Sequence, residues 1–342
     1  MEWKSVIYEY ISRLTQCEAE NKQPYHLEMI ADPRFKQIEL ERLHRTKLRN
    51  QERGVRSLGV EIRLILRNEE ENEHNHKQGV RVELMLKRTW SYSVRAREHA
   101  EEKIEHLYFT LVQPFGDEWV IMLIEPVIPE KRTIEDDPAI VSSINVMARR
   151  LVRSMPYLNA EIFDQGHSFA LGRAASYQRD AVKAYADKHW NDPNPQFLHF
   201  AVDCTNYVSQ CLYAGGAPMD YTEVRDAGWW YRGKQGTQEG WSYSWSVANS
   251  FCQYLSSPRR NGLRADIVTA PSELTIGDVI CYDFNGDGRF QHSTIVTGTD
   301  GAGMPLVNAH TTDCKARYWD YRDSYAWTER TVYRFLRIKD RF

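Results

Sequence analysis

The spacing of hydrophobic positions divides the first part of the chain into helices followed by strands. Within residues 3–17 apolar side chains recur every three or four positions, which predicts an amphipathic helix. Asp32 followed by Pro33 is typical of the cap and first turn of a second helix, which we expect to run to about Asn50. Beyond that point apolar and polar residues alternate, which predicts half-buried strands.

Four alternating segments predict a sheet. The expected strands cover residues 60–66, 80–86, 107–111 and 119–123, with an acidic loop at 68–79 and a turn at 115–118. Helices followed by a four-stranded antiparallel sheet make an α+β domain, which we place at residues 1–126. In element order alone this accessory domain resembles cone-shaped, cystatin-like or nuclear-transport-factor-like modules. Its function stays unknown, and binding of a protein partner is one role for it.

The rest of the chain divides into a linker and a second domain. Prolines and charged residues dominate residues 127–172, which we interpret as a linker that contains one helix at about 139–153. Residues 173–342 form the second domain. Its expected helices span 174–190, Cys204 to Gly215, and 247–255, and its expected strands span 278–284, 289–298, 304–310 and 331–337.

Composition excludes several classes of function. The 342 residues carry a net charge of −3, with 42% hydrophobic and 27% charged residues, as in an ordinary globular protein. This balance gives no reason to expect nucleic acid or an anionic membrane surface as a partner. No apolar run approaches the ~20 residues of a membrane span, and the N-terminus lacks the pattern of a secretory signal. We therefore expect a cytoplasmic protein, which could act at the cell wall only after release by another route.

The six cysteines have no CxxC spacing, which favours free thiols in a reducing compartment over a disulfide framework. One of them, Cys204, follows Asp203 at the start of an amphipathic run. A thiol at a helix N-terminus or beside a protonated histidine has a lowered pKa, and the N–H groups of such a terminus can bind an oxyanion. Taken alone, however, a cysteine is more often a small buried hydrophobe.

A histidine and two further polar residues follow Cys204 in the chain. His292 begins an alternating strand, so its ring can face a site on one side of the sheet. A thiolate–imidazolium pair needs a third group that orients the ring, and the next strand offers Asn308 and His310 on one face. Each residue alone favours a structural role. The order of cysteine, histidine and a polar group one strand later favours a nucleophile with its general base.

The second domain resembles a known family over about residues 173–335. The family is a bacterial amidase domain, amidase family six, related to the NlpC-type cell-wall peptidases and the CHAP amidases, all of papain-like fold. The most specific match is the run Asp203-Cys204-Thr205-Asn206-Tyr207-Val208-Ser209-Gln210. Further matching segments are 177–182, 277–280, 287–288, 292–293 and 309–313.

The resemblance implies a papain-like cysteine hydrolase that cleaves amides through a thioester. Cys204 would be the nucleophile, His292 the general base and His310 the third residue, with Asn308 as the second choice. Asp203 and Tyr177 would support the site. The expected substrates are peptidoglycan stem peptides or related amides, without metal or cofactor. Two alternatives remain, a catalytically silent binding module of the same fold and an acyltransferase or transglutaminase-like enzyme.

Three other groups carry weaker signals. Trp229, Trp230 and Trp245 lie between the cysteine and the histidine, where they could line a substrate groove, although aromatic side chains are more often core. Residues 283–288 begin like a calcium loop but lack its twelfth-position Glu, which favours a hairpin turn. The pair His74 and His76 has no third ligand nearby in the sequence, so we expect a solvated turn there.

Overall fold

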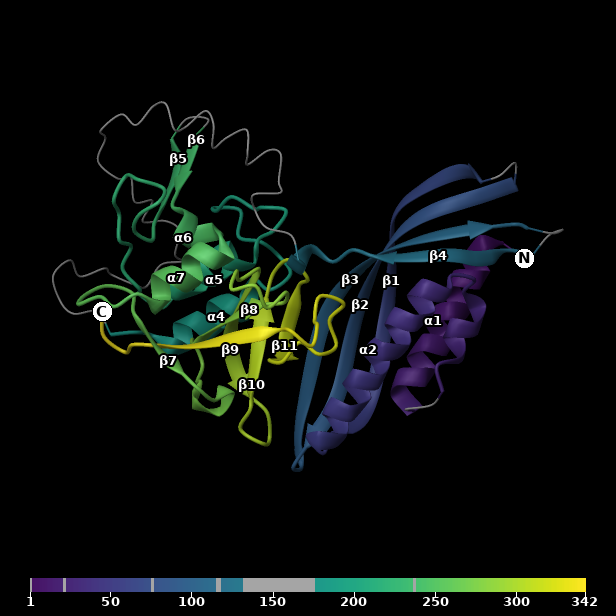
Figure 1. Ribbon diagram of the computed structural model, residues 1–342, viewed down its shortest axis with the longest axis horizontal. Coiled ribbons are helices and arrows are strands. Elements are labelled where there is room, and N and C mark those ends of the chain that lie inside the picture. The colour runs from purple at the N-terminus through teal and green to yellow at the C-terminus, as the bar shows by residue number, and fades with distance from the viewer. Residues whose placement is uncertain (1, 21–22, 75–76, 115–117, 132–175, 236–237) are drawn as a thin grey trace. The chain divides into compact units, whose positions relative to one another are not determined.

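The structure is a computed structural model that describes residues 2–20, 23–74, 77–114, 118–131, 176–235 and 238–342 (Figure 1). The chain divides into two compact units. Unit 1 comprises Met1–Ile128 together with Asp300–Ala302 and Ala316–Trp327, and unit 2 comprises Pro129–Thr299, Gly303–Lys315 and Thr328–Phe342. The expected boundary near residue 126 is close to the first division, but the two C-terminal segments in unit 1 were not expected. The predicted linker helix at 139–153 lies outside the described residues.

Unit 1 combines two long helices with an antiparallel sheet. The helices are α1 (Trp3–Glu20) and α2 (Pro33–Glu52), with a short 3-10 helix η1 (Tyr25–Met29) between them. The strands are β1 (Arg56–His74), β2 (Lys77–Val94), β3 (Arg97–Val112) and β4 (Val120–Pro126), paired β1–β2, β2–β3 and β3–β4. The carboxylate of Asp32 accepts a hydrogen bond from Arg34 N at 2.9 Å, which confirms the predicted cap of α2.

The sheet of unit 1 differs from the prediction in two ways. Within the segment predicted as an acidic loop, residues 68–74 and 77–79 are strand. β1 extends to His74, and β2 begins at Lys77. Charge density suggested a loop, yet a strand places alternate residues on its solvent face, and Glu70 there lies opposite Arg81. In addition, β11 (Cys314–Tyr318), whose last three residues belong to unit 1, lies beside β3, so the predicted number of four strands is too low.

The core of unit 1 lies between the helices and one face of the sheet. Side chains from α1 contact alternate residues of the central strands, as the helical and alternating patterns predict. The buried residues include Ile7, Tyr10, Leu14, Val82, Leu84, Phe109 and Ile121. A cavity of about 820 Å³ lies in unit 1, lined by residues of α2 and of strands β1–β3 that include Arg42, Trp90 and Lys103.

His26 in η1 should make unit 1 sensitive to acid. Its side chain is fully buried, and neither ring nitrogen has a hydrogen-bond partner in the described part of the chain. Burial lowers the pKa of His26 to about 4, whereas an unfolded histidine has an ordinary value near ~6.5. The unfolded chain therefore binds the proton more readily, and the free energy of unfolding should fall by up to about 3 kcal/mol as pH decreases from ~6.5 to ~4.

Urea unfolding at pH 7 and pH 4.5 measures this loss. The variant His26→Phe keeps a ring against Tyr10, whose centroid lies 5.5 Å from that of His26, and should lose less stability than the wild type between these pH values. His44→Ala, at an exposed position on α2, is the control and should follow the wild type. Equal acid sensitivity in His26→Phe and wild type would contradict the prediction.

Unit 2 packs helices on a second antiparallel sheet. Its helices are α4 (Arg179–Lys188), α5 (Cys204–Ala214), α6 (Tyr243–Ser246) and α7 (Ala248–Ser256), with short 3-10 helices η2 (Pro129–Lys131) and η5 (Pro271–Glu273). Its main strands are β7 (Ala265–Val268), β8 (Val279–Asp283), β9 (His292–Thr299), β10 (Pro305–Ala309) and β12 (Val332–Ile338). They are ordered β10-β9-β8-β12-β7, with antiparallel neighbours, and β5 (Tyr231–Gln235) pairs separately with β6 (Gln238–Trp241).

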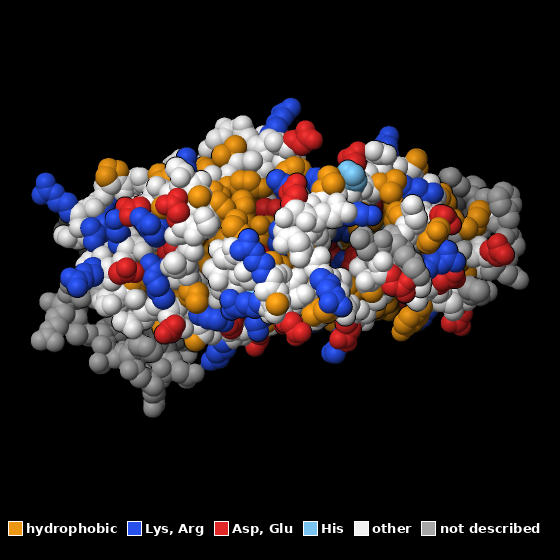
Figure 2. Space-filling view, turned by 90° about the horizontal axis from the view of Figure 1, so that it is seen from below, with side chains coloured by type: hydrophobic (Ala, Val, Ile, Leu, Met, Phe, Trp, Pro, Cys, Tyr) orange, Lys and Arg blue, Asp and Glu red, His pale blue; other side chains and the backbone are white. Residues whose placement is uncertain are grey.

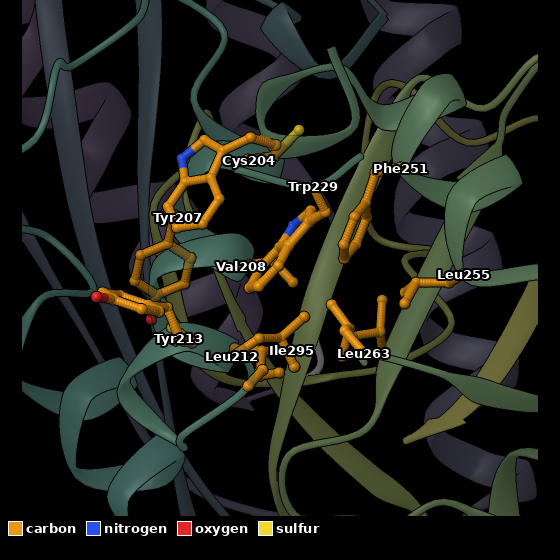
Figure 3. Close-up of a cluster of buried hydrophobic side chains, with 14 of the residues drawn as sticks. Cys204, Tyr207, Val208, Leu212, Tyr213, Trp229, Phe251, Leu255, Leu263 and Ile295 are labelled. Carbon is orange, nitrogen blue, oxygen red and sulfur yellow. The ribbon is translucent and has the colours of Figure 1, made fainter. Parts of the chain in front are cut away.

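The four strands predicted for the tail are confirmed to within a few residues, whereas β7 and β11 were missed. Helix α5 is central to the core of unit 2, because every residue from Cys204 to Tyr213 is buried (Figure 3). Figure 3 shows Val208 and Leu212 of this helix near Trp229 and Ile295.

On the face of the molecule shown in Figure 2, Lys and Arg side chains are interspersed with Asp and Glu, in keeping with the small net charge.

Candidate active site

The N-terminus of α5 is capped by a side chain that the sequence did not reveal. The Asp203 carboxylate makes no cap bond to the helix backbone, contrary to expectation. Instead the hydroxyl of Thr311 accepts hydrogen bonds from the backbone N–H groups of Asp203 and Cys204, each at 3.0 Å. Thr311 has a φ of +88°, a strained backbone conformation for a β-branched residue. In this conformation Thr311, two residues after the end of β10, lies against the first turn of α5.

The Cys204 thiol is buried at this helix terminus, with 2% of the residue exposed. Its Sγ lies 3.7 Å from Thr205 Oγ1 and 4.0 Å from the carbonyl oxygen of Gln291. Burial raises the pKa of the Cys204 thiol, and hydrogen bonds from Thr205, from the backbone of Ser293 and from Thr311 offset only part of that effect. The pKa shift of Cys204 is therefore opposite in direction to the lowering expected at a helix N-terminus, and burial favours the neutral thiol.

The start of β9 lies beside this thiol. Gln291 and Ser293 lie on either side of His292. The carbonyl oxygen of Gln291 and the backbone of Ser293 contact the Cys204 thiol. In addition, the hydroxyl of Thr205, the next residue, donates a hydrogen bond to Ser293 Oγ at 3.2 Å. The structure thus brings the backbone of His292 to Cys204, as the sequence order predicted. The ring of His292 is buried near Tyr282 and Phe284, with centroids 5.5 and 6.2 Å away. Its role as general base stays a prediction.

His310 is held by Asp203 rather than by the other predicted residues. Its Nδ1 lies 2.8 Å from Asp203 Oδ2, and its Nε2 lies 2.5 Å from the carbonyl oxygen of His189. The ring also stacks on Tyr207 with centroids 4.0 Å apart. Because both ring nitrogens are engaged, this geometry gives no support to the expectation that His310 orients His292.

Asp203 and His310 form a buried hydrogen-bonded pair. Burial alone would lower the pKa of His310, but the hydrogen bond and the negative charge of Asp203 outweigh it and raise that pKa. Burial alone would raise the pKa of Asp203, but hydrogen bonds from His199 and His310 lower it. Opposite shifts of this kind are typical of an imidazolium–carboxylate pair. Asp203 therefore holds His310 and does not cap the helix, and its support of the active site stays a prediction.

The second choice for the third residue, Asn308, is also engaged elsewhere. Its Oδ1 accepts a hydrogen bond from Thr297 Oγ1 at 2.8 Å, and its Nδ2 donates to Asp187 Oδ1 at 3.1 Å. These bonds tie β10 to β9 and α4. The assignment of a third catalytic residue stays a prediction for both Asn308 and His310.

Tyr177 is a structural residue near the opposite end of α5. Its hydroxyl donates to the carbonyl oxygen of Gly277 at 2.6 Å. A side chain at Gly215, the residue after α5, would collide with Tyr177 and with Val182. Tyr177 therefore fixes the C-terminal end of the helix whose first residue is Cys204, and its support of the site is indirect.

The prediction that three tryptophans line a groove is wrong. Trp229, Trp230 and Trp245 expose at most 3% of their surface, because they pack into the core of unit 2. The indole of Trp229 donates to Ser209 Oγ at 3.0 Å, and the indole of Trp245 donates to Asn206 Oδ1 at 2.8 Å. These bonds hold the segment around Trp229 and helix α6 against α5, which is the structural role that aromatic residues more often have.

The segment at 283–288 is a turn between β8 and β9. The Asp283 carboxylate accepts hydrogen bonds from the backbone N–H groups of Asn285, Gly286 and Gly288 at 2.7–3.1 Å. The segment connects two antiparallel neighbouring strands, as expected of a hairpin connection. The turn delivers the chain to His292, so Asp283 positions the start of β9.

Comparison with known proteins places the candidate site in a recognised domain. Residues 176–336 match a family described as "Putative amidase domain", a region that includes Cys204, His292, Asn308 and His310. The match supports a hydrolase of amide bonds at a general level. It does not reach β1–β4 or the helices of unit 1.

Two proteins of Bacillus subtilis (strain 168) are similar to this chain. Uncharacterized protein YhbB is 52% identical over 171 residues, which cover 50% of this chain and 53% of YhbB. Uncharacterized protein YjcM is 30% identical over 149 residues, which cover 40% of this chain and 31% of YjcM. The chain thus matches about half of YhbB and about a third of YjcM. No solved structure matches the chain, and within the described residues no helix is long and apolar enough to cross a membrane.

Proposed function

We propose that unit 2 is a cysteine-dependent amide hydrolase with Cys204 as its nucleophile. The observation that carries the proposal is the position of the Cys204 thiol, at the first residue of α5 and against the backbone on both sides of His292. The general match to an amidase domain over residues 176–336 supports the same reaction class.

The neutral thiol determines how the proposed reaction begins. Because burial raises the pKa of Cys204, a base must remove the proton as the sulfur attacks the amide carbonyl. We assign that role to His292, which would then protonate the leaving amine. The first N–H groups of a helix lack acceptors within the helix, and those that follow Cys204 would bind the oxyanion. Water would finally hydrolyse the thioester and release the acid.

We propose peptidoglycan stem peptides or related amides as substrates and a papain-like fold for unit 2. The support is the sequence resemblance to cell-wall amidases and peptidases, together with a helix that begins with cysteine and packs against an antiparallel sheet. Unit 1 would then bind a partner or position the enzyme. A catalytically silent binding module is the second candidate, because the resting thiol is buried and both predicted third residues are engaged by other groups.

Product analysis with defined substrates tests this proposal. The full chain is incubated with stem-peptide fragments of known sequence, and the products are identified by mass spectrometry. A hydrolase yields two fragments whose summed mass exceeds that of the substrate by one water. Added amine should leave these products unchanged in a hydrolase, whereas a transferase would form a new amide. Intact fragments in every reaction, at chain concentrations equal to those of the substrate, would favour the silent module.

A further inference from the structure

Three polar side chains that the proposed reaction does not use meet beside the N-terminus of α5. His199, Asp203 and His310 each offer one ligand atom, and the three atoms lie within 4.8 Å of one another. Asp203 Oδ2 is 2.8 Å from the nitrogen of His310 and 3.4 Å from that of His199. The sequence analysis expected no metal in this protein, and His310 follows Asp203 by more than a hundred residues.

The hydrogen bonds of His310 define what its Nδ1 can do. A carbonyl oxygen only accepts, so the 2.5 Å contact with His189 O fixes the hydrogen on Nε2. A neutral ring then has its lone pair on Nδ1, which faces a carboxylate oxygen at 2.8 Å. Two acceptors at this distance repel each other unless a cation lies between them. Either a second proton or a metal ion can supply that charge.

Asp203 is oriented in a similar way. Its Oδ1 accepts hydrogen bonds from Asn206 Nδ2 at 2.8 Å and from Phe200 N at 3.0 Å. These bonds hold the carboxylate so that Oδ2 faces both histidines. A histidine whose other nitrogen is bonded to a carbonyl, next to a carboxylate fixed by its own hydrogen bonds, is the outer-shell arrangement that orients metal ligands.

We propose that His199, Asp203 and His310 bind a divalent transition-metal ion, with Zn²⁺ as the best fit. Imidazole and carboxylate are zinc ligands, and at ~2.0–2.1 Å from a tetrahedral ion they would lie about 3.3 Å apart. The two separations from Asp203 Oδ2, 2.8 and 3.4 Å, are close to this value. The side chain of His199 is 58% exposed, which leaves an open side for entry of the ion and for a water as fourth ligand.

The ion would fasten a loop and a strand end to the helix of the nucleophile. His199 belongs to the loop before α5, Asp203 precedes Cys204 directly, and His310 follows β10. The bound ion would therefore stabilise unit 2 against unfolding. This proposal does not rest on amide hydrolysis, since a silent binding module would bind the ion equally well.

Metal titration of the full chain tests the site. Metal-free protein is titrated with Zn²⁺ by calorimetry and with Co²⁺ by visible absorption, and its unfolding temperature is measured with and without Zn²⁺. We expect one ion per chain, a higher unfolding temperature and a Co²⁺ spectrum without a thiolate charge-transfer band. His199→Ala should weaken Zn²⁺ binding at least tenfold and remove the thermal shift. Because this ring is largely exposed, the variant should retain the wild-type circular dichroism.

Two controls separate the proposed site from other ligands. His44→Ala removes an exposed histidine of α2, and the double variant His74→Ala and His76→Ala removes the other histidine pair of the sequence. Both should bind Zn²⁺ as the wild type does. The proposal would be overturned by undetectable Zn²⁺ binding to the wild type, by unchanged affinity in His199→Ala, or by a thiolate band in the Co²⁺ spectrum. Loss of binding only in the double variant would overturn it as well.

Discussion

Replacement of Cys204 by Ala should reduce the rate of amide hydrolysis at least about a thousandfold, because no other group can form the thioester. Cys204→Ser should lose nearly as much, since a hydroxyl gives up its proton less readily than a thiol. Initial rates with the stem-peptide fragments measure both effects. The stability of each variant should change little, because a serine or alanine fits the space of the small buried thiol.

Cys211→Ala is the matched control for this prediction. It removes a second buried thiol from the same helix, two turns from the first. The control should keep a rate within a few fold of the wild type, whereas covalent labelling by an acyl-activated substrate should be lost only in Cys204→Ala. Hydrolysis that persists in Cys204→Ala, with purified protein and no contaminating activity, would exclude the thioester mechanism.

The fold of unit 2 was largely predictable because its elements have strong local patterns. Alternation placed β8, β9, β10 and β12, and an amphipathic run ending at Gly215 placed α5. β11 was missed although Cys314, Ala316 and Tyr318 alternate with Lys315 and Arg317, because a run of five residues is too short to stand out. The side chain of Arg317 is nevertheless buried, since its charge is paired with Asp323. The apolar pattern does not predict the burial of Arg317, because that burial depends on the ion pair with Asp323.

The candidate site was predictable only in part, for a related reason. Cys204 and His292 stand out by residue type and by their place at the start of a helix and a strand. Thr311 and His199 lie in loops and have no such signal, although one caps α5 and the other faces Asp203. The engagement of His310 by Asp203 and by the His189 carbonyl depends on a chain fold that brings the end of β10 to the start of α5.

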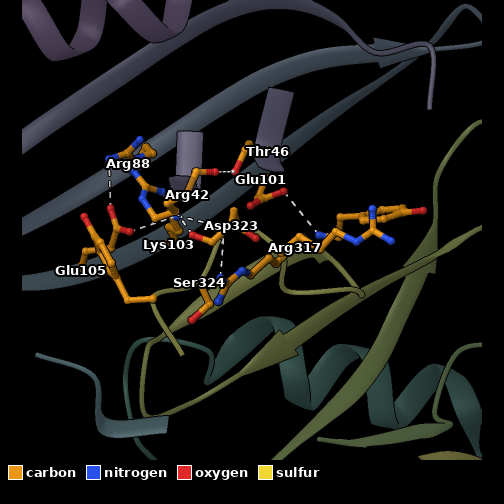
Figure 4. Close-up of polar contacts among 12 residues, drawn as sticks. Arg42, Thr46, Arg88, Glu101, Lys103, Glu105, Arg317, Asp323 and Ser324 are labelled. Atoms are coloured by element: carbon orange, nitrogen blue, oxygen red, sulfur yellow. Dashed lines mark hydrogen bonds and ion pairs between the residues drawn. The ribbon is translucent and has the colours of Figure 1, made fainter. Parts of the chain in front are cut away.

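Asp323 holds the buried charges of unit 1 together. Its Oδ1 accepts a hydrogen bond from Arg49 at 3.0 Å, and its Oδ2 accepts from Lys103 and Arg317, each at 3.0 Å. Figure 4 shows Lys103 and Arg317 converging on this carboxylate from different elements. The three cations are at most 4% exposed. Burial acts against ionisation, yet the three positive charges keep the pKa of Asp323 well below its usual range.

Asp323→Ala should therefore lower the free energy of unfolding of unit 1 by about 3–5 kcal/mol, because it leaves buried cations without their shared partner. Urea unfolding measures the change. Asp266→Ala is the matched control, since Asp266 forms an exposed pair with Lys339, and its loss should cost less than about 1 kcal/mol. If Asp323→Ala lowers the free energy of unfolding by less than about 1 kcal/mol, the prediction is wrong, and the remaining carboxylates are sufficient to neutralise the buried cations. The large expected cost arises from uncompensated charge and not from lost contact area, so Asp323→Asn, which keeps the shape but not the charge, should be nearly as destabilising as alanine.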